Sequence, residues 1–199
     1  ANTMASINPL SQLYEPYNVN ETWRSMGNLQ LDYKIHGFED LRFNLNLGLD
    51  YATSGGYNTT PIGSEQSYHS TDQNGSGYRS DYEYHRMDKT LEAYVAYNKD
   101  FNEAHHFDAM LGYSWQHFYS KSYSKSYRLT NETVIGEYPG AGELFLVSFF
   151  GRVNYSYDNR YMVTATLRRD GTSRFQQNKW GLFPSVSAGW NITNEPWAQ

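Results

Sequence analysis

The sequence contains no cysteine, which excludes disulfide bonds, thiolate metal ligands and cysteine nucleophiles together. No stretch approaches the roughly 18 consecutive apolar residues that a transmembrane helix requires. The 16 Lys and Arg residues against 21 Asp and Glu give a net charge of −5, and the cations are scattered along the chain. A nucleic-acid-binding protein would usually carry a basic stripe. Composition therefore argues against a helical membrane protein and a nucleic-acid binder.

Aromatic residues are abundant, with 19 Tyr and 5 Trp among 199 residues. These rings have an apolar body and a polar tip, so they suit membrane interfaces and surfaces that stack on carbohydrates or peptides. The mean hydropathy of −0.76 is polar. A β-barrel wall turns only half of its strand residues towards lipid and carries long loops, so this average is compatible with a membrane barrel.

The segment Val147–Ile192 contains three runs in which apolar and polar side chains alternate. Successive side chains of a strand point to opposite faces, so each run predicts a strand with one apolar and one polar face. The turn Asp158–Arg160 joins the first two runs, and a longer polar loop joins the last two. Two structures give this pattern: an antiparallel sheet on a protein core, or a membrane barrel with a polar lumen.

The barrel explains two further features of this segment. Each run can supply roughly the 9–11 residues with which a tilted strand crosses a bilayer. Aromatic residues gather at the ends of the runs, as expected for girdles at both membrane interfaces. Tyr157 and Tyr161 flank the short turn, and Phe175, Trp180 and Phe183 lie at or near the opposite ends.

The same segment resembles a known family. Residues 148–175, SFFGRVNYSYDNRYMVTATLRRDGTSRF, and residues 179–190, KWGLFPSVSAGW, are similar to the barrel of SusC/RagA-like TonB-dependent outer-membrane transporters. The similarity extends more weakly to residues 8–35 and 41–51. It implies a barrel in the outer membrane of a Gram-negative bacterium that imports oligosaccharides or peptides. It also implies two partners, a SusD-like surface lipoprotein and TonB.

Period-two patterning predicts seven antiparallel strands. Their expected bounds are 28–35, 41–51, 89–98, 106–116, 146–157, 161–169 and 182–192. Residues 1–20, 52–88, 117–144 and 170–181 are expected to be loops, whereas 36–40, 99–105 and 158–160 are short turns. Long connections of a bacterial barrel lie outside the cell and short ones in the periplasm, which fixes the orientation. Pro184 is expected at a bulge or near a strand start, because proline cannot donate to a ladder.

We expect residues 1–199 to be part of a larger barrel without its plug domain. Bacterial barrels close with an even number of strands, so seven cannot be the whole wall. The sequence does not begin with Met and shows no signal-peptide core in its first ten residues, which favours a mature or excised segment.

The candidate functional residues lie on the polar face of the predicted wall or at its outer mouth. The loop from Arg168 to Phe175 has the densest charge, and its Asp170 is expected either to contact solute or to pair with arginines and fix the hairpin. The wider polar face could line a solute path or hydrogen-bond a plug. The lumen or mouth candidates are Arg152, Asn154, Arg168, Asp170 and Arg174.

No catalytic, cofactor or metal site is expected. Adjacent residues of a strand point apart, so His105 and His106 cannot easily share an ion. Asp81, Glu83 and Asp88 near His85 lie in a predicted polar loop without a nucleophile motif. The function expected is therefore a barrel-wall segment of a nutrient importer. The alternative is a soluble extracellular β-sandwich that binds glycans, which would have to cover its apolar strand faces with a second sheet.

Overall fold

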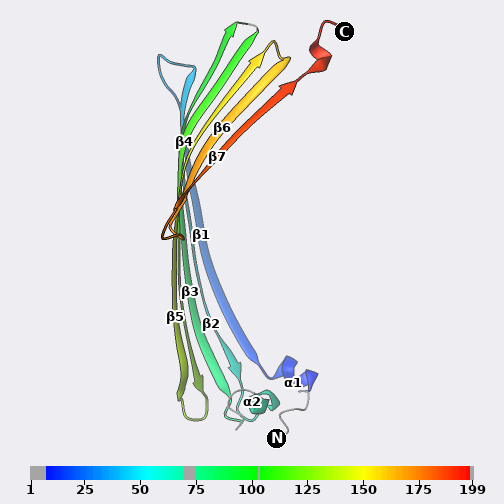
Figure 1. Ribbon diagram of the computed structural model, residues 1–199. Helices are drawn as coiled ribbons and strands as arrows, with labels where there is room; N and C mark the ends of the chain where they lie inside the picture. The colour runs from blue at the N-terminus through cyan, green and yellow to red at the C-terminus, as the bar shows by residue number, and fades with distance from the viewer. Residues whose placement is uncertain (1–7, 70–74, 103, 198–199) are drawn as a thin grey trace. The chain divides into compact units, whose positions relative to one another are not determined.

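The computed structural model describes residues 8–69, 75–102 and 104–197, and within them the chain forms one antiparallel sheet. Figure 1 shows its strands, which neighbour one another in chain order, β1-β2-β3-β4-β5-β6-β7. Their bounds are β1 Tyr17–Lys34, β2 Leu41–Thr60, β3 Tyr78–Asn102, β4 His105–Arg128, β5 Val134–Tyr157, β6 Tyr161–Thr172 and β7 Trp180–Trp190. Short helical turns are α1 Pro9–Tyr14, α2 Glu65–His69 and η1 Ile192–Asn194. The expected all-β antiparallel fold is confirmed.

Contacts divide the chain into two units. Unit 1 consists of Ala1–Ser25, Asp50–Met87 and Tyr119–Gly142. Unit 2 consists of Met26–Leu49, Asp88–Phe118 and Glu143–Gln199, and it contains the connections β1–β2, β3–β4 and β5–β6 together with β6 and β7. Strands β1 to β5 contribute residues to both units.

The strands are longer than the sequence pattern predicted. The first strand begins at Tyr17 instead of residue 28, and the expected loop 52–88 is occupied by β2 as far as Thr60, by α2, and by β3 from Tyr78. Likewise β4 and β5 leave only residues 129–133 between them, where a loop over 117–144 was expected. Apolar alternation identifies a strand only where one face is apolar, whereas the backbone ladder continues where both faces are polar.

Two predicted features fall partly outside the described residues. The loop expected at 1–20 contains α1 and the start of β1, and its residues 1–7 are not described. The loop expected at 52–88 includes residues 70–74, which are not described; Gly75, which follows them, has a φ of 69°.

The short turn between β5 and β6 has the backbone that its sequence favours. Asp158 and Asn159 both have a φ of 52°, the left-handed region that a type I′ turn requires at its two central residues. The Arg160 N–H closes the turn by donating to the Tyr157 carbonyl at 2.9 Å. Asp and Asn adopt this conformation more readily than other non-glycine residues, so these two residues favour the tight hairpin.

Pro184 lies inside β7 with no bulge, contrary to expectation. It faces Leu167 within an uninterrupted register between β6 and β7. Asn191 donates to the Arg160 carbonyl at 2.7 Å, and hydrogen-bonded pairs alternate with non-bonded ones along an antiparallel ladder. Pro184 is seven residues from Asn191 and so belongs to a non-bonded pair, where a missing N–H removes no bond to β6.

The odd-numbered side chains of β5 and β6 in unit 2, with the even-numbered ones of β7, form an apolar face. Within the described part of the chain no hydrophobic residue is buried, and Val186 on this face is 76% exposed. Rows of aromatic rings bound the face. Tyr157, Tyr161 and Trp190 are register partners at the short turn. At the other end the rings of Phe149 and Trp180 lie 6.1 Å apart, eight residues from Tyr157 and ten from Trp190 along their strands.

The distance between the two aromatic rows matches a bilayer. Tyr161 and Gly171, the partner of Trp180, are separated by ten residues, or about 33 Å along the strand. A strand tilted by about 40° covers about 25 Å of membrane normal over that length, which is the height of the apolar band on transmembrane barrels. We call this surface, between the Tyr161 and Trp180 rows, the apolar belt.

Candidate functional site

The opposite face of β5 and β6 holds the polar residues singled out in the sequence. Register pairs Arg152 with Thr166, Asn154 with Thr164, and Asp170 with Ser148. Directly opposed residues of antiparallel strands project to the same side. Four of the five candidates, Arg152, Asn154, Arg168 and Asp170, therefore share one face of unit 2, which we call the polar wall.

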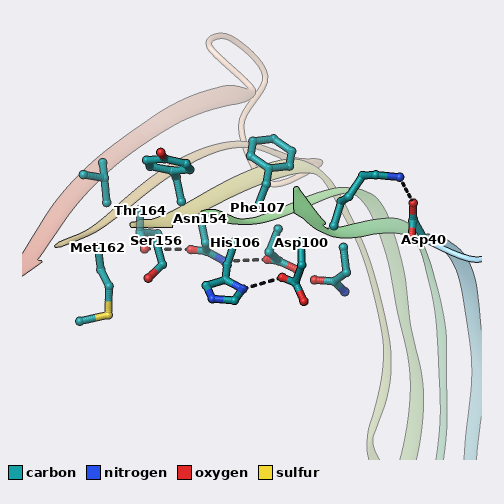
Figure 2. Close-up of a pocket in the computed structure, with 13 residues that line it drawn as sticks. Asp40, Asp100, His106, Phe107, Asn154, Ser156, Met162 and Thr164 are labelled. Carbon is teal, nitrogen blue, oxygen red and sulfur yellow. Dashed lines mark hydrogen bonds and ion pairs between the residues drawn. The ribbon is translucent and has the colours of Figure 1, made fainter. Parts of the chain in front are cut away.

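Asn154 is the centre of a hydrogen-bonded network near the short turns. Its Nδ2 donates to Asp108 Oδ1 at 2.7 Å, and Thr164 Oγ1 donates to its Oδ1 at 2.8 Å. The amide thus joins β4, β5 and β6 by donating to one neighbour and accepting from the other (Figure 2). This arrangement fixes the orientation of the amide, because an exchange of its nitrogen and oxygen would oppose the Asp108 carboxylate to an oxygen.

The same network lines a concavity of about 700 Å³. Two contacts extend it towards the turns: His106 Nδ1 lies 2.5 Å from Asp100 Oδ1, and Lys99 Nζ forms an ion pair with Asp40 Oδ2 at 2.5 Å (Figure 2). Three carboxylates, two primary amides and hydroxyls therefore surround one hollow. Such a surface can hydrogen-bond a hydrated solute or another polar protein surface. Sequence analysis did not single out Asp40 or Asp100, and it considered His106 only as a metal ligand.

A second concavity of about 390 Å³ lies nearer the loop between β6 and β7. There Arg168 Nε donates to Asp170 Oδ1 at 2.7 Å and to Oδ2 at 3.0 Å, and Nη2 donates to Ser148 Oγ at 3.2 Å. Asp170 therefore does pair with an arginine. Both side chains keep open surface, 51% for Arg168 and 38% for Asp170, so the pair still presents charge to the hollow.

Aromatic rings on the polar wall were not anticipated. The register places Phe150 and Phe183 on either side of Arg168. The Phe150 ring lies over Gly112, where an added Cβ would come within 2.3 Å of it. The expectation that Phe183 belongs to the lipid-side girdle is wrong, because Arg168 is its partner on the polar side. The sequence indicated this, because Phe183 is odd-numbered whereas the apolar residues Leu182 and Val186 of the same strand are even-numbered.

Arg152 and Arg174 do not join either network. Arg152 is an exposed residue of β5 opposite Thr166. Arg174 lies in the connection between β6 and β7, where its backbone N–H donates to Thr172 Oγ1 at 3.3 Å. The charged segment from Arg168 to Phe175 therefore has two parts. Arg168 and Asp170 form one site, and Arg174 lies apart from it in the connection between β6 and β7.

The group of Asp81, Glu83, Asp88 and His85 lies in β3, and its Asp81 and His85 make hydrogen bonds within unit 1. Its Asp81 accepts from Arg79 Nε at 2.8 Å and from the Tyr127 hydroxyl at 3.1 Å, whereas His85 Nδ1 lies 3.1 Å from Thr53 Oγ1. Burial and the Asp81 carboxylate raise the pKa of Tyr127, at the end of β4. These residues lie in a strand rather than in the predicted loop, because β3 begins at Tyr78.

His105 and His106 have different partners, as their alternation in a strand predicts. His105 Nδ1 lies 2.6 Å from the Tyr155 hydroxyl, which belongs to the apolar face, whereas His106 pairs with Asp100. Among the residues that the structure describes, no helix is long and apolar enough to cross a membrane.

A single sheet with an apolar belt of bilayer height on one face and a hydrogen-bonded polar wall on the other defines a wall segment of a membrane β-barrel. The family comparison agrees: residues 3–198 match the family TonB dependent receptor-like, beta-barrel. The chain belongs to this family.

Two TonB-dependent receptors are similar to most of this sequence. TonB-dependent receptor SusC of Bacteroides thetaiotaomicron is 35% identical over 208 residues, which are 98% of this chain and 20% of SusC. TonB-dependent receptor P3 of Formosa agariphila is 35% identical over 74% of this chain and 16% of its own length. The chain therefore spans about a fifth of the relatives it matches.

Solved structures show the same fold. The RagAB peptide transporter aligns with a TM-score of 0.80 at 20% identity, covering 93% of this chain and 21% of that chain. RagAB in its 'open-open' state aligns with a TM-score of 0.83 at 18% identity, covering 96% and 22%. The resemblance to SusC/RagA-like transporters is confirmed, and the chain is a barrel segment rather than a soluble β-sandwich. The relatives are receptors and transporters rather than enzymes.

Proposed function

We propose that this chain is part of the wall of an outer-membrane importer in a Gram-negative bacterium. The whole protein takes up oligosaccharides or peptides that a SusD-like surface lipoprotein delivers, and TonB supplies the energy from the inner membrane. The observation that carries the proposal is the pairing of the apolar belt with the polar wall on opposite faces of the same strands. The name of one relative, TonB-dependent receptor SusC, supports the dependence on TonB, and the name of the RagAB peptide transporter supports peptides as a substrate class.

In this proposal the polar wall is the solute-facing or plug-facing surface of the barrel. Arg168 and Asp170 offer paired charges beside the Phe183 ring, which suits a solute with both polar and apolar parts. Asn154 with Asp108 and Thr164 offers hydrogen bonds nearer the periplasmic turns. The exposed guanidinium of Arg152 adds positive charge along the wall. Arg174, in the loop between β6 and β7, adds positive charge at its mouth. The role is passage and contact rather than catalysis.

An uptake experiment tests the function. The full-length transporter is expressed from its chromosomal locus, and uptake of fluorescent oligosaccharide and peptide mixtures is compared with that of strains lacking TonB or the neighbouring lipoprotein. Uptake that needs TonB is the expected result. Uptake that persists at the same rate without TonB would contradict active import, and loss of the lipoprotein without any effect would remove the proposed partner.

A further inference from the structure

Arg169 is a charged residue on the apolar face. Its register partners are Phe149 in β5 and Leu182 in β7, which are 49% and 60% exposed. Its guanidinium carbon lies 5.0 Å from the centre of the Trp180 ring. In the described part of the chain no carboxylate pairs with Arg169, because Asp170 points to the polar wall and binds Arg168. The two consecutive arginines thus have different environments.

Arg169 lies near the rim of the apolar belt. It is eight residues from Tyr161 and two from Gly171, the partner of Trp180. An arginine on the lipid face is costly at the bilayer midplane but costs little near the interface. The long side chain can lay its stem along the apolar face and hold its charged head at headgroup depth. Placement at the rim therefore makes this cation available to lipid phosphates at little cost.

An apolar groove of about 720 Å³ lies on the same face. Small residues, Ala109, Gly151 and Ala165, make its floor, and larger ones such as Leu111 and Leu167 make its walls. A Cβ added to Gly151 would meet Leu111 Cδ1 at 3.7 Å, an ordinary van der Waals contact, so Leu111 lies beside this glycine without crowding it. Leu167 and Arg169 are two residues apart on one strand face, about 7 Å, so the groove approaches the cation.

We propose that Arg169 and this groove together bind one anionic membrane lipid, with its phosphate at Arg169 and an acyl chain over Gly151. The proposal rests on the outer-membrane placement argued above, in which the longer connection after β6 faces outwards and Arg169 meets the outer leaflet. Charge complementarity selects an anionic headgroup, and the apolar floor selects a chain rather than a free ion. A free anion could bind the guanidinium of Arg169 but would leave the apolar groove empty.

The test measures lipid retention on the purified full-length barrel. Protein is reconstituted in phosphatidylcholine vesicles containing a minor fraction of phosphatidylglycerol, extracted gently, and the retained lipids are counted by native mass spectrometry. Arg169→Gln removes the charge, and Gly151→Leu fills the groove without changing charge. Lys121→Gln is the matched control, since it removes one exposed positive charge from β4 away from the groove.

Retention of phosphatidylglycerol over phosphatidylcholine is expected to fall about fivefold in Arg169→Gln, the value of one cation near an anionic surface. A similar loss is expected in Gly151→Leu and none in Lys121→Gln. Unchanged selectivity in Arg169→Gln would overturn the proposal. Inorganic phosphate is also added as a competitor. If it displaces phosphatidylglycerol fully from the parent but not from Arg169→Gln, and Gly151→Leu retains lipid as the parent does, the site binds a free anion and the proposal is overturned.

Folding and transport are measured on the same samples to separate the two proposals. Heat-modifiable migration reports the barrel, and uptake reports the importer. Barrels that fold and import solute but show no lipid selectivity overturn only the lipid site. If Arg169→Gln fails to fold, the parent barrel is tested in 1 M salt, where screening is expected to abolish selectivity for phosphatidylglycerol and its persistence would contradict a role for charge.

Discussion

The carboxylate of Glu195 accepts a hydrogen bond from the hydroxyl of Tyr161 at 2.7 Å. The Trp190 indole N–H donates to the same oxygen at 3.0 Å, and Arg160 donates to the other at 3.4 Å. Glu195 therefore links the end of β7 to the turn between β5 and β6. Only 6% of the residue is exposed. Because three donors converge on it, this carboxylate holds the aromatic row at the short-turn edge of the apolar belt.

Glu195→Gln is expected to lower the thermal unfolding temperature of the detergent-solubilised barrel by a few degrees. The amide keeps the shape of the side chain but loses its charge and presents an N–H₂ to one of the donors. Tryptophan fluorescence against temperature measures the effect. Glu39→Gln, in the exposed turn between β1 and β2, is the control and should leave the transition in place. Equal transitions for all three proteins would show that the Glu195 contacts contribute nothing measurable.

The same contact predicts an acid-dependent loss of stability. Tyr161, then Trp190 and Arg160, hold the pKa of Glu195 below its ordinary value of 4.5 by donating to its charged form. A lowered pKa stabilises the fold above about pH 4.5, and that stability disappears as the pH falls through the folded-state pKa. The gap in unfolding temperature between the parent and Glu195→Gln should therefore close between pH 5 and the acid end of the titration. A gap that widens in acid would reverse the assigned sign.

Asn154→Ala is expected to destabilise the barrel by about 1–2 kcal/mol, because it leaves the half-buried groups of Asp108 and Thr164 without their partner. Urea unfolding of the full barrel measures this loss. Arg152→Ala on the same strand and face is the matched control, because its side chain is exposed and it joins neither hydrogen-bonded network. If both variants lose the same stability, the amide is not the centre of a network.

Asp170→Asn separates a solute contact from a hairpin brace. The Arg168–Asp170 pair is exposed, and exposed pairs contribute about 0–1 kcal/mol, so the unfolding temperature should change little. Solute uptake should change by several-fold if the charges face the path, because the amide leaves Arg168 uncompensated. Uptake kinetics with anionic and cationic peptides measure this. Lost stability with unchanged uptake would make the pair a brace.

The sequence predicted the part of the sheet where its two faces differ in polarity. From Val163 to Arg168, apolar and polar residues alternate, and the register with β5 and β7 follows that alternation. The sequence pattern missed most of the strand residues in unit 1, because the alternation there is not between apolar and polar side chains. Tyr119 to Tyr127 alternates Tyr or Lys with Ser, which is a period of two, but its low complexity resembles a loop. Pairing of backbones, rather than burial, holds such a strand.

The candidate site was predictable at the level of a face and not of a contact. Parity alone put Arg152, Asn154, Arg168 and Asp170 together. The partners of Asn154 come from β4 and β6, so finding them requires the register between strands. The same applies to Phe183, whose placement opposite Arg168 depends on a seven-residue connection, 173–179, that sets how β7 meets β6.

Site-directed spin labelling along β6 tests the central claim most directly, that one face of this sheet meets lipid and the other meets water. Single cysteines are placed at each position from 161 to 171 of the reconstituted full-length barrel, and this segment contributes no cysteine of its own. The account predicts a period of two, with odd positions such as Val163, Ala165 and Leu167 accessible to oxygen and even positions accessible to a water-soluble nickel complex. Equal access of the nickel complex to both sets would contradict it.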